Sequence, residues 1–130
     1  MIAAPASGSG KTILTCGLLQ ALKDRGLEPV SFKCGPDYID PMFHSRILDI
    51  SARNLDTYFM TDDQIIHTLT RAGSHPIIIE GVMGIYDGLK PDTRMGSSYE
   101  TAHISNTPII LTVDARGAGR TIISIIKGIL

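Results

Sequence analysis

The sequence has no tryptophan, only two cysteines and few aromatic residues, which make up 5% of its 130 positions. Cys16 and Cys34 have neither the spacing of metal ligands nor that of a disulfide framework, so we expect a reducing compartment. The formal net charge is only −1, which provides no field to attract nucleic acid or anionic lipid. Long apolar runs are also missing, since none reaches the roughly eighteen residues that a membrane span needs.

The apolar start of the chain lacks the basic region of a signal peptide, so a cytoplasmic location is expected by elimination. The composition that remains, with 43% hydrophobic and 19% charged residues, is typical of a globular protein. A chain of this length can form one domain with a core but is too short for two. Neither an internal repeat nor a linker divides it.

Short apolar runs alternate with segments of helical periodicity along the chain. Strands are expected at residues 1–4, 29–33, 77–79 and 109–113. Helices are expected at residues 12–25, 61–72, 97–106 and 118–130, and residues 35–56 are predicted to form a long loop with one short helix near 41–48. This alternation predicts a three-layer α/β/α fold of the P-loop NTPase type with a mainly parallel sheet. Because such sheets usually contain more strands, we expect residues 1–130 to be a partial domain, truncated at its C-terminus.

A phosphate-binding loop is indicated where the first strand gives way to the first helix, in the segment PASGSGKT (residues 5–12). Its glycines allow backbone N–H groups to turn toward an anion, and the helix adds its positive N-terminal end. Lys11 is expected to reach the β- and γ-phosphates of ATP, and the Thr12 hydroxyl to bind Mg²⁺. Pro5 stands where the consensus has glycine. The predicted nucleotide-binding residues are Ser7, Gly8, Ser9, Gly10, Lys11 and Thr12.

Acidic residues follow two of the expected strands. Glu80 ends the run of three isoleucines at the carboxyl edge of the sheet, where ligands of α/β sheets bind, so its carboxylate could hold Mg²⁺. The structural alternative is that it caps a neighbouring helix. Asp114 follows the strand at 109–113 in the same way, and there we expect a helix cap or an outer hydrogen-bond acceptor.

The segment CGPDYIDP (residues 34–41) follows the second strand and should reach the same edge. Lys33, Asp37, Tyr38 and Asp40 would then project toward the group that receives the γ-phosphoryl of ATP. A rigid turn without such a role is the alternative, because proline, aspartate and glycine are common turn residues. The four histidines have no metal-ligand spacing and are expected to be ordinary surface or partly buried residues; they are His44, His67, His75 and His103.

Three segments together resemble the cobyrinic acid a,c-diamide synthase family: APASGSGKT (4–12), FKCGPDYIDP (32–41) and EGVMGIYDG (80–88). The segments NLD (54–56) and VDARG (113–117) extend the likeness, in order, over nearly the whole chain. Proline at position 5 is what that family carries in place of the consensus glycine. The resemblance implies the N-terminal ATP-binding domain of a synthetase, with a P-loop fold like that of dethiobiotin synthetase.

The activity that the resemblance implies is ATP- and glutamine-dependent amide synthesis. Family members activate the c and then the a acetate carboxylate of cobyrinic or hydrogenobyrinic acid as acyl phosphates, which ammonia from glutamine then attacks. Carried over by position, Thr12 and Glu80 would hold Mg²⁺, with Asp56 as a second metal carboxylate. The residues assigned to phosphoryl transfer are Lys33, Asp37, Asp40 and Asp87, and those assigned to substrate binding are Tyr38, Asp37, Asp40 and Asp87.

The family's carboxyl-terminal glutaminase domain has no counterpart in these 130 residues. The expected partners are therefore the tetrapyrrole and ammonia from a glutaminase domain elsewhere, and we expect these residues alone to bind nucleotide weakly and to make no amide. The sequence leaves a homodimer, the metallation of the tetrapyrrole, the order of amidation and the nucleotide base open.

Three other functions stay open. A switch ATPase of the chromosome-partitioning or septum-placement type shares the fold, but its phosphate loop carries a signature lysine where this chain has Ala6 and Ser7. A related synthetase could act on another tetrapyrrole or on a biotin precursor, although PDYIDP (36–41) favours the a,c-diamide branch. A truncated nucleotide-binding module without catalytic activity is the third.

Overall fold

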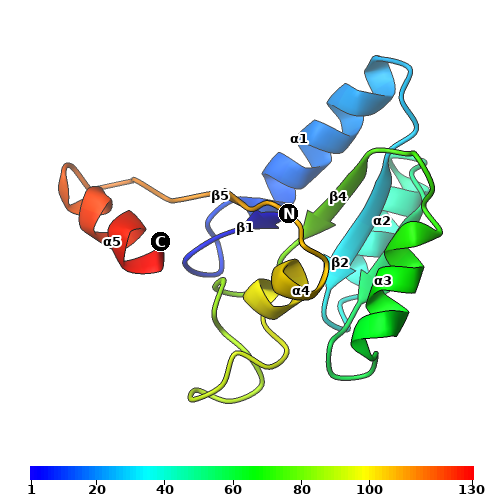
Figure 1. The fold of residues 1–130 in the computed structure, drawn as a ribbon. Coiled ribbons are helices and arrows are strands. Elements are labelled where there is room, and N and C mark those ends of the chain that lie inside the picture. Colours follow the sequence, from blue (N-terminus) through cyan, green and yellow to red (C-terminus); the bar gives the residue numbers. More distant parts are fainter.

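A five-stranded, fully parallel sheet with the order β3-β2-β4-β1-β5 forms the centre of the computed structural model, which describes residues 1–130 (Figure 1). Its strands are β1 (Ile2–Ala3), β2 (Val30–Cys34), β3 (Ala52–Leu55), β4 (Ile77–Glu80) and β5 (Ile110–Leu111). Lys33 on β2 lies opposite both Glu80 on β4 and Asn54 on β3. Because all strands run in one direction, the loops that follow them meet at one edge of the sheet.

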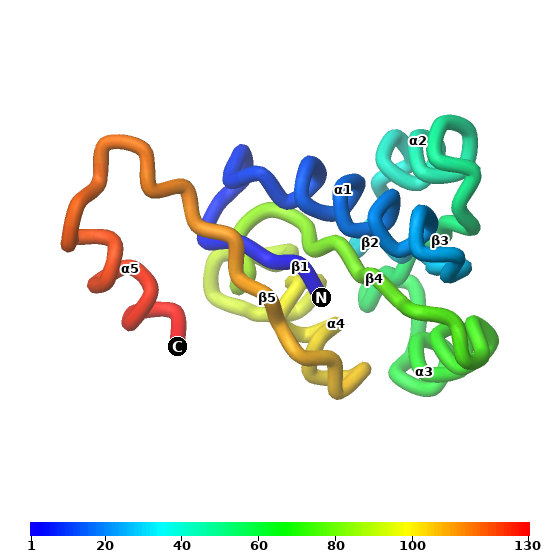
Figure 2. The backbone as a smooth tube through the Cα atoms, turned by 90° about the horizontal axis from the view of Figure 1, so that it is seen from above, coloured from blue at the N-terminus to red at the C-terminus, as the bar shows by residue number.

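Helices cover both faces of this sheet. They are α1 (Lys11–Asp24), α2 (Ile39–Arg46), α3 (Asp62–Thr70), α4 (Ser98–Ile104) and α5 (Thr121–Ile129). α1 contacts β1 and β4, and α2 contacts β2 and β3, so these two helices share one face (Figures 1 and 2). α3 and α4 lie on the other face, while α5 extends away from the sheet with no buried residue. The three-layer α/β/α fold is thereby confirmed. None of these helices is long and apolar enough to traverse a bilayer.

The two faces of the sheet differ in chemistry, because successive residues of a strand point to opposite sides. Phe32 and Cys34 of β2 enter the apolar core under α3 and α4, which also contains Leu55, Ile65 and Ile79. The alternate residues of β2 point the other way: Ser31 and Lys33 are buried and contact α2. One short strand thus supports both the core and a polar layer.

All the expected strands and helices are found, together with one strand that was not expected. The helix expected at 61–72 begins with the capping box that its sequence indicates: Gln64 N–H donates to the Thr61 hydroxyl, and Thr61 N–H donates to the Gln64 side chain. The loop predicted over residues 35–56 was wrong in its last part, where residues 52–55 form β3. This strand contains Arg53 and Asn54 and buries only Leu55, so its sequence carries no apolar pattern, and pairing with β2 makes it a strand.

Candidate functional site

The predicted phosphate loop leads from β1 to α1 and has the geometry of an anion site. Gly8 and Gly10 have φ angles of 75° and 84°, a left-handed conformation that glycine adopts without strain. α1 then begins at Lys11, which leaves the backbone N–H groups of its first turn without helical partners. A depression of about 240 Å³ opens here, lined by Gly8, Gly10, Lys11, Thr12 and Ile13. Of the predicted loop residues, Ser7 and Ser9 lie in the exposed turn, where the Ser9 hydroxyl donates to Ala6 O at 3.0 Å.

Lys11 links the phosphate loop to the segment that follows β4 by two hydrogen bonds. Its ammonium donates to Ala6 O at 3.1 Å and to Met83 O at 2.6 Å, and the residue is buried. Burial lowers the pKa of Lys11 and the charge of Lys33 acts in the same direction, while Glu80 and Asp87 partly oppose both. Carbonyl oxygens are weak substitutes for phosphate oxygens, so the ammonium is placed to exchange them for an anion.

Glu80 joins the phosphate loop to the loop that follows β2. Thr12 Oγ1 donates to Glu80 Oε1 at 2.6 Å, and Lys33 Nζ donates to the same oxygen at 2.8 Å. Glu80 is 0% exposed, and its second oxygen, Oε2, is buried without any hydrogen-bond partner. Buried carboxylate oxygens are normally satisfied, so a free one beside a threonine hydroxyl fits the oxygen ligands that Mg²⁺ takes. Two of the three residues predicted to bind the metal, Thr12 and Glu80, are therefore brought together.

Lys33 forms the centre of an acidic cluster at this edge. Its ammonium lies 2.6 Å from Asp40 Oδ2 and 3.8 Å from Asp37 Oδ2. Burial alone would lower the pKa of Lys33, but hydrogen bonds to Asp40 and Glu80 and their charges outweigh burial and raise it. Lys33 therefore stays charged as the counterion of these carboxylates. Tyr38 is 74% exposed beside the cluster.

The loop that carries Asp37 and Tyr38 is held in place by β3. The Asn54 side chain donates to Gly35 O at 2.8 Å and to Asp37 O at 2.5 Å. Asp37 Oδ1 in turn accepts from Ile39 N–H at 2.9 Å, close to the start of α2. Sequence reasoning assigned no role to Asn54, although the NLD segment contributed to the family resemblance.

The segment 81–88 packs tightly against the phosphate loop. Gly84 N–H donates to Asp87 Oδ2 at 2.9 Å. A Cβ atom at Gly84 would lie 2.5 Å from both this oxygen and Pro5 O, so no side chain fits there. Asp87 is exposed, and its charge acts on Lys11. The structure thus places the fourth predicted catalytic residue beside the phosphate loop.

Two predicted acids lie apart from this cluster. Asp56 Oδ1 accepts from Tyr58 N–H at 2.9 Å in the turn after β3, and it contacts neither Thr12 nor Glu80, so its metal role stays a prediction. No group of three or more His, Cys, Asp or Glu side chains could hold a metal ion by itself. Asp114 was expected to be a helix cap or an outer hydrogen-bond acceptor. It caps no helix, and it accepts from the Arg116 side chain and backbone, which lowers the pKa of Asp114 to about 2.

A buried polar layer lies directly beneath the charged cluster, and sequence reasoning missed it. His44 is 0% exposed, not a surface residue, and it lies between Ser31 Oγ, 2.9 Å from its Nδ1, and Cys16 Sγ, 3.5 Å from its Nε2. These residues come from α2, β2 and α1. Cys16 lies four residues after Thr12, and His44 four after Asp40, one helical turn in each case. Burial, together with Lys33, lowers the pKa of His44 against the opposing charges of Glu80 and Asp40.

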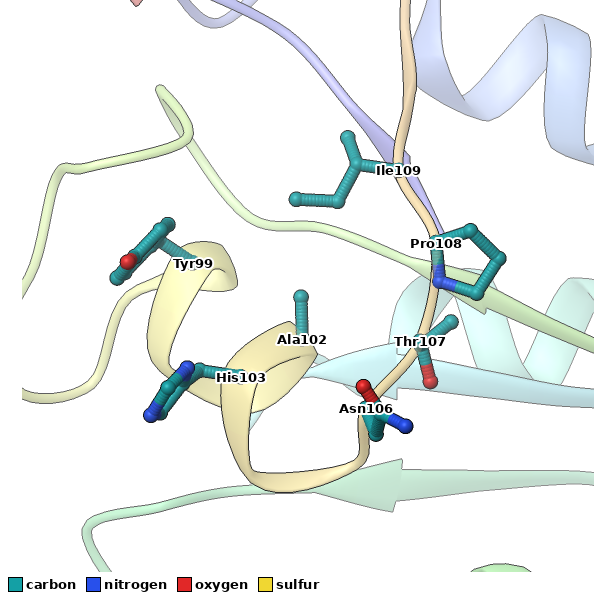
Figure 3. A pocket seen from close by; sticks show the side chains of 7 residues that line it. All are labelled: Tyr99, Ala102, His103, Asn106, Thr107, Pro108 and Ile109. Carbon is teal, nitrogen blue, oxygen red and sulfur yellow. The ribbon is translucent and has the colours of Figure 1, made fainter. Parts of the chain in front are cut away.

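A larger cavity, about 350 Å³, lies along the flank of α4 toward the start of β5 (Figure 3). Its lining residues are Tyr99, Ala102, His103, Asn106, Thr107, Pro108 and Ile109. None of them is a predicted site residue, and no carboxylate or lysine is among them. The candidate site is therefore the smaller depression at the phosphate loop, with the cluster around Glu80 beside it.

Comparison with known proteins identifies a family that matches almost the whole chain. The sequence model of the CobQ/CobB/MinD/ParA nucleotide binding domain family matches residues 1–129. The chain belongs to this family. In nucleotide-binding domains with a phosphate loop, a helix N-terminus and the lysine and threonine of the loop hold the triphosphate, so the roles predicted for Lys11 and Thr12 are consistent with this family.

Curated relatives of this nucleotide-binding domain carry the name suggested by the resemblance. This chain is 48% identical over 124 residues to the hydrogenobyrinate a,c-diamide synthase of Rhodobacter capsulatus, and 41% identical over 130 residues to the cobyrinate a,c-diamide synthase of Priestia megaterium. The cobyrinate a,c-diamide synthase of Leptospira interrogans is 39% identical over 131 residues. These alignments cover 92%, 98% and 99% of this chain but 28%, 28% and 29% of the relatives. The chain thus spans less than a third of their length.

Proposed function

We propose that this domain is the ATP-binding and phosphoryl-transfer part of a cobyrinate or hydrogenobyrinate a,c-diamide synthase, an amide ligase of cobalamin biosynthesis. The observation that carries the proposal is the position of Glu80. One of its oxygens accepts from both Thr12 of the phosphate loop and Lys33 of the acidic cluster. A nucleotide on the loop would therefore have its terminal phosphate next to the cluster. The names of the relatives supply the substrate class.

The roles follow from the contacts of each residue. Lys11 would exchange its two carbonyl partners for phosphate oxygens. Thr12 and Glu80 would hold Mg²⁺, which when bound neutralises phosphate charge. A substrate carboxylate needs no general base to act as a nucleophile, so the domain must only align two anions and screen their repulsion. Lys33, which stays charged at this edge, would provide that screening.

The acids of the cluster would orient the reaction and not take a proton. Asp40 holds the Lys33 ammonium at 2.6 Å, Asp37 lies 3.8 Å from the same ammonium, and Asp87 binds Gly84 N–H beside the phosphate loop. Asp37 and Asp87 would accept hydrogen bonds from the tetrapyrrole. The c and then the a acetate carboxylate would be phosphorylated here to an acyl phosphate. Ammonia from glutamine would then displace phosphate and leave the amide.

Ammonia would reach the acyl phosphate from a glutaminase unit outside residues 1–130. We therefore expect the isolated domain to bind nucleotide weakly and to make no amide from glutamine. Amide formation from glutamine by these 130 residues alone would contradict this part of the proposal.

A switch ATPase is the second candidate, because the matched family description includes MinD and ParA. Such proteins carry a lysine at the start of the phosphate loop, and Ala6 and Ser7 occupy that region here. Phosphate release that requires cobyrinic acid supports the synthetase, whereas release driven by nucleic acid or lipid without it supports the switch.

The test uses the full-length protein with ATP, glutamine and cobyrinic acid. We expect phosphate release to depend on cobyrinic acid and to match amide formation. Asp37→Asn should lower turnover about 100-fold with unchanged nucleotide affinity, because it removes a charge next to Lys33 but no contact of the phosphate loop. The control Asp24→Asn alters an exposed acid at the end of α1 and should change nothing. Normal turnover in Asp37→Asn would show that Asp37 is only a turn residue.

A further inference from the structure

Arg94, in the loop that connects β4 to α4, packs over the neighbouring rings of Tyr86 in this loop and Tyr99 on α4. Its guanidinium carbon lies 5.1 Å from the ring centre of Tyr86 and 4.9 Å from that of Tyr99, and the two ring centres are 5.1 Å apart. Tyr99 is itself braced by His103, whose ring stacks on it at 6.1 Å; Figure 3 shows the two side chains next to each other on α4. We call Arg94, Tyr86 and Tyr99 the arginine clamp.

The clamp orders the Arg94 side chain but uses none of its hydrogen-bonding capacity. The guanidinium carbon lies over the faces of both rings, and contacts of this kind use the positive charge of the guanidinium and not its five N–H donors. None of the side-chain hydrogen bonds and none of the six ion pairs in the structure involves Arg94, and the residue is exposed. A planar fork of free donors, held in one orientation, is suited to bind a carboxylate in a bidentate manner.

Arg94 and Tyr86 of the clamp lie in the same loop as Asp87, one of the acidic residues of the candidate site. Tyr86 directly precedes Asp87, whose carboxylate binds Gly84 N–H beside the phosphate loop. The cations nearer the chemistry are already committed, since Lys33 is paired with three carboxylates and Lys11 faces the nucleotide site. A substrate with several carboxylates would therefore meet several acids at this edge, and Arg94 is the cation there that the two tyrosine rings hold in place; Lys90 in the same loop is exposed and has no ring contact of this kind.

We infer that Arg94 binds a peripheral carboxylate of the tetrapyrrole, a different one from the carboxylate that is phosphorylated, and thereby selects for polyanionic substrates. This inference rests on the proposed function and adds the residue that recognises the outer part of the substrate. Binding energy from such a remote group helps to place the reacting carboxylate.

The experiment measures KM for cobyrinic acid and KM for ATP separately in the full-length protein. Arg94→Gln should raise the KM for cobyrinic acid about 10- to 100-fold, since it removes a charge-assisted pair, and should leave the KM for ATP unchanged. Arg94→Lys keeps the charge without the fork and should give an intermediate KM. Arg71→Gln is the matched control, because Arg71 is an exposed arginine without an ion pair at the end of α3.

The clamp itself is tested with a pair of variants at Tyr99. Tyr99→Phe keeps the ring and should behave like the unmodified protein, whereas Tyr99→Leu removes the ring and should raise the KM for cobyrinic acid severalfold. An unchanged KM in Arg94→Gln, or an equal rise in both KM values, would overturn the role of Arg94 while leaving the proposed function intact. If the unmodified protein neither binds nor converts cobyrinic acid, the proposed function and this inference both fail.

Discussion

At the scale of single residues, Glu80 gives the proposed function most of its support. It is the end of a buried strand, it is fully buried itself, and one of its oxygens accepts from Thr12 and from Lys33. Its other oxygen has no partner in the structure. Buried carboxylate oxygens normally have hydrogen-bond partners, so this free oxygen supports the proposal that Glu80 is a metal ligand.

Replacement of this carboxylate by an amide should separate metal binding from folding. Glu80→Gln keeps the size of the side chain but removes its charge, so we expect the Mg²⁺ concentration for half-maximal phosphate release to rise about 10- to 100-fold. The measurement is phosphate release by the full-length protein over a Mg²⁺ titration. Glu28→Gln, at an exposed glutamate before β2, is the control. An unchanged Mg²⁺ requirement in Glu80→Gln would remove the metal role from Glu80.

At the scale of elements, the site is set by how α1 and α2 pack on one face of the sheet, α1 against β1 and β4 and α2 against β2 and β3. The upper layer contains Thr12, Asp40 and Lys33, from α1, α2 and β2 respectively, and the lower layer contains Cys16, His44 and Ser31 in the same arrangement. The lower layer is one helical turn away from the upper one along both helices. The packing of His44 thus fixes the register in which the charged residues meet.

The burial of His44 makes the free energy of unfolding depend on pH. Burial lowers the pKa of His44 below its ordinary value of about 6.5, so the unfolded chain binds more protons than the folded one below that pH. The contribution of neutral His44 to stability should therefore be fully present above about pH 7, and it should decrease as the pH falls through about 6.5 toward the lowered pKa of His44.

Chemical denaturation of the full-length protein at pH 7.5 and at pH 5.5 measures this decrease. The glutamine in His44→Gln cannot take up a proton, so the stability of this variant should fall less between pH 7.5 and pH 5.5 than that of the unmodified protein. We expect the variant to be less stable than the unmodified protein at pH 7.5. His67→Gln, at an exposed histidine on α3, should keep the whole decrease. Equal decreases in the unmodified protein and in His44→Gln would show that His44 is not the group responsible.

The same elements show what sequence can and cannot predict. The phosphate loop, Glu80 and Lys33 could be predicted, because local spacing after a strand determines which edge of a parallel sheet they reach. The strand β3 and the role of Asn54 could not, because both depend on hydrogen bonds to β2 and to the loop after it, which come from distant residues. His44 was missed for a similar reason, since only the packing of α2 against β2 shows that it is buried.

At the scale of the whole molecule, the residues that we assign to the phosphates and to Mg²⁺ lie in the phosphate loop, at the start of α1 and at the end of β4. The chain nevertheless spans less than a third of the relatives it matches. On our account these residues direct the γ-phosphoryl group of ATP to a substrate carboxylate, and the amide is completed with ammonia made elsewhere. The central claim is therefore the destination of that phosphoryl group.

Transfer of oxygen from the substrate to phosphate tests this claim most directly. Cobyrinic acid labelled with heavy oxygen in its carboxylates is incubated with the full-length protein, ATP and glutamine in unlabelled water, and the released phosphate is analysed by mass. An acyl phosphate requires one carboxylate oxygen to leave with each phosphate, so the account predicts one heavy oxygen in each phosphate released per amide formed. Phosphate whose added oxygen comes only from water would mean simple ATP hydrolysis and would contradict the account.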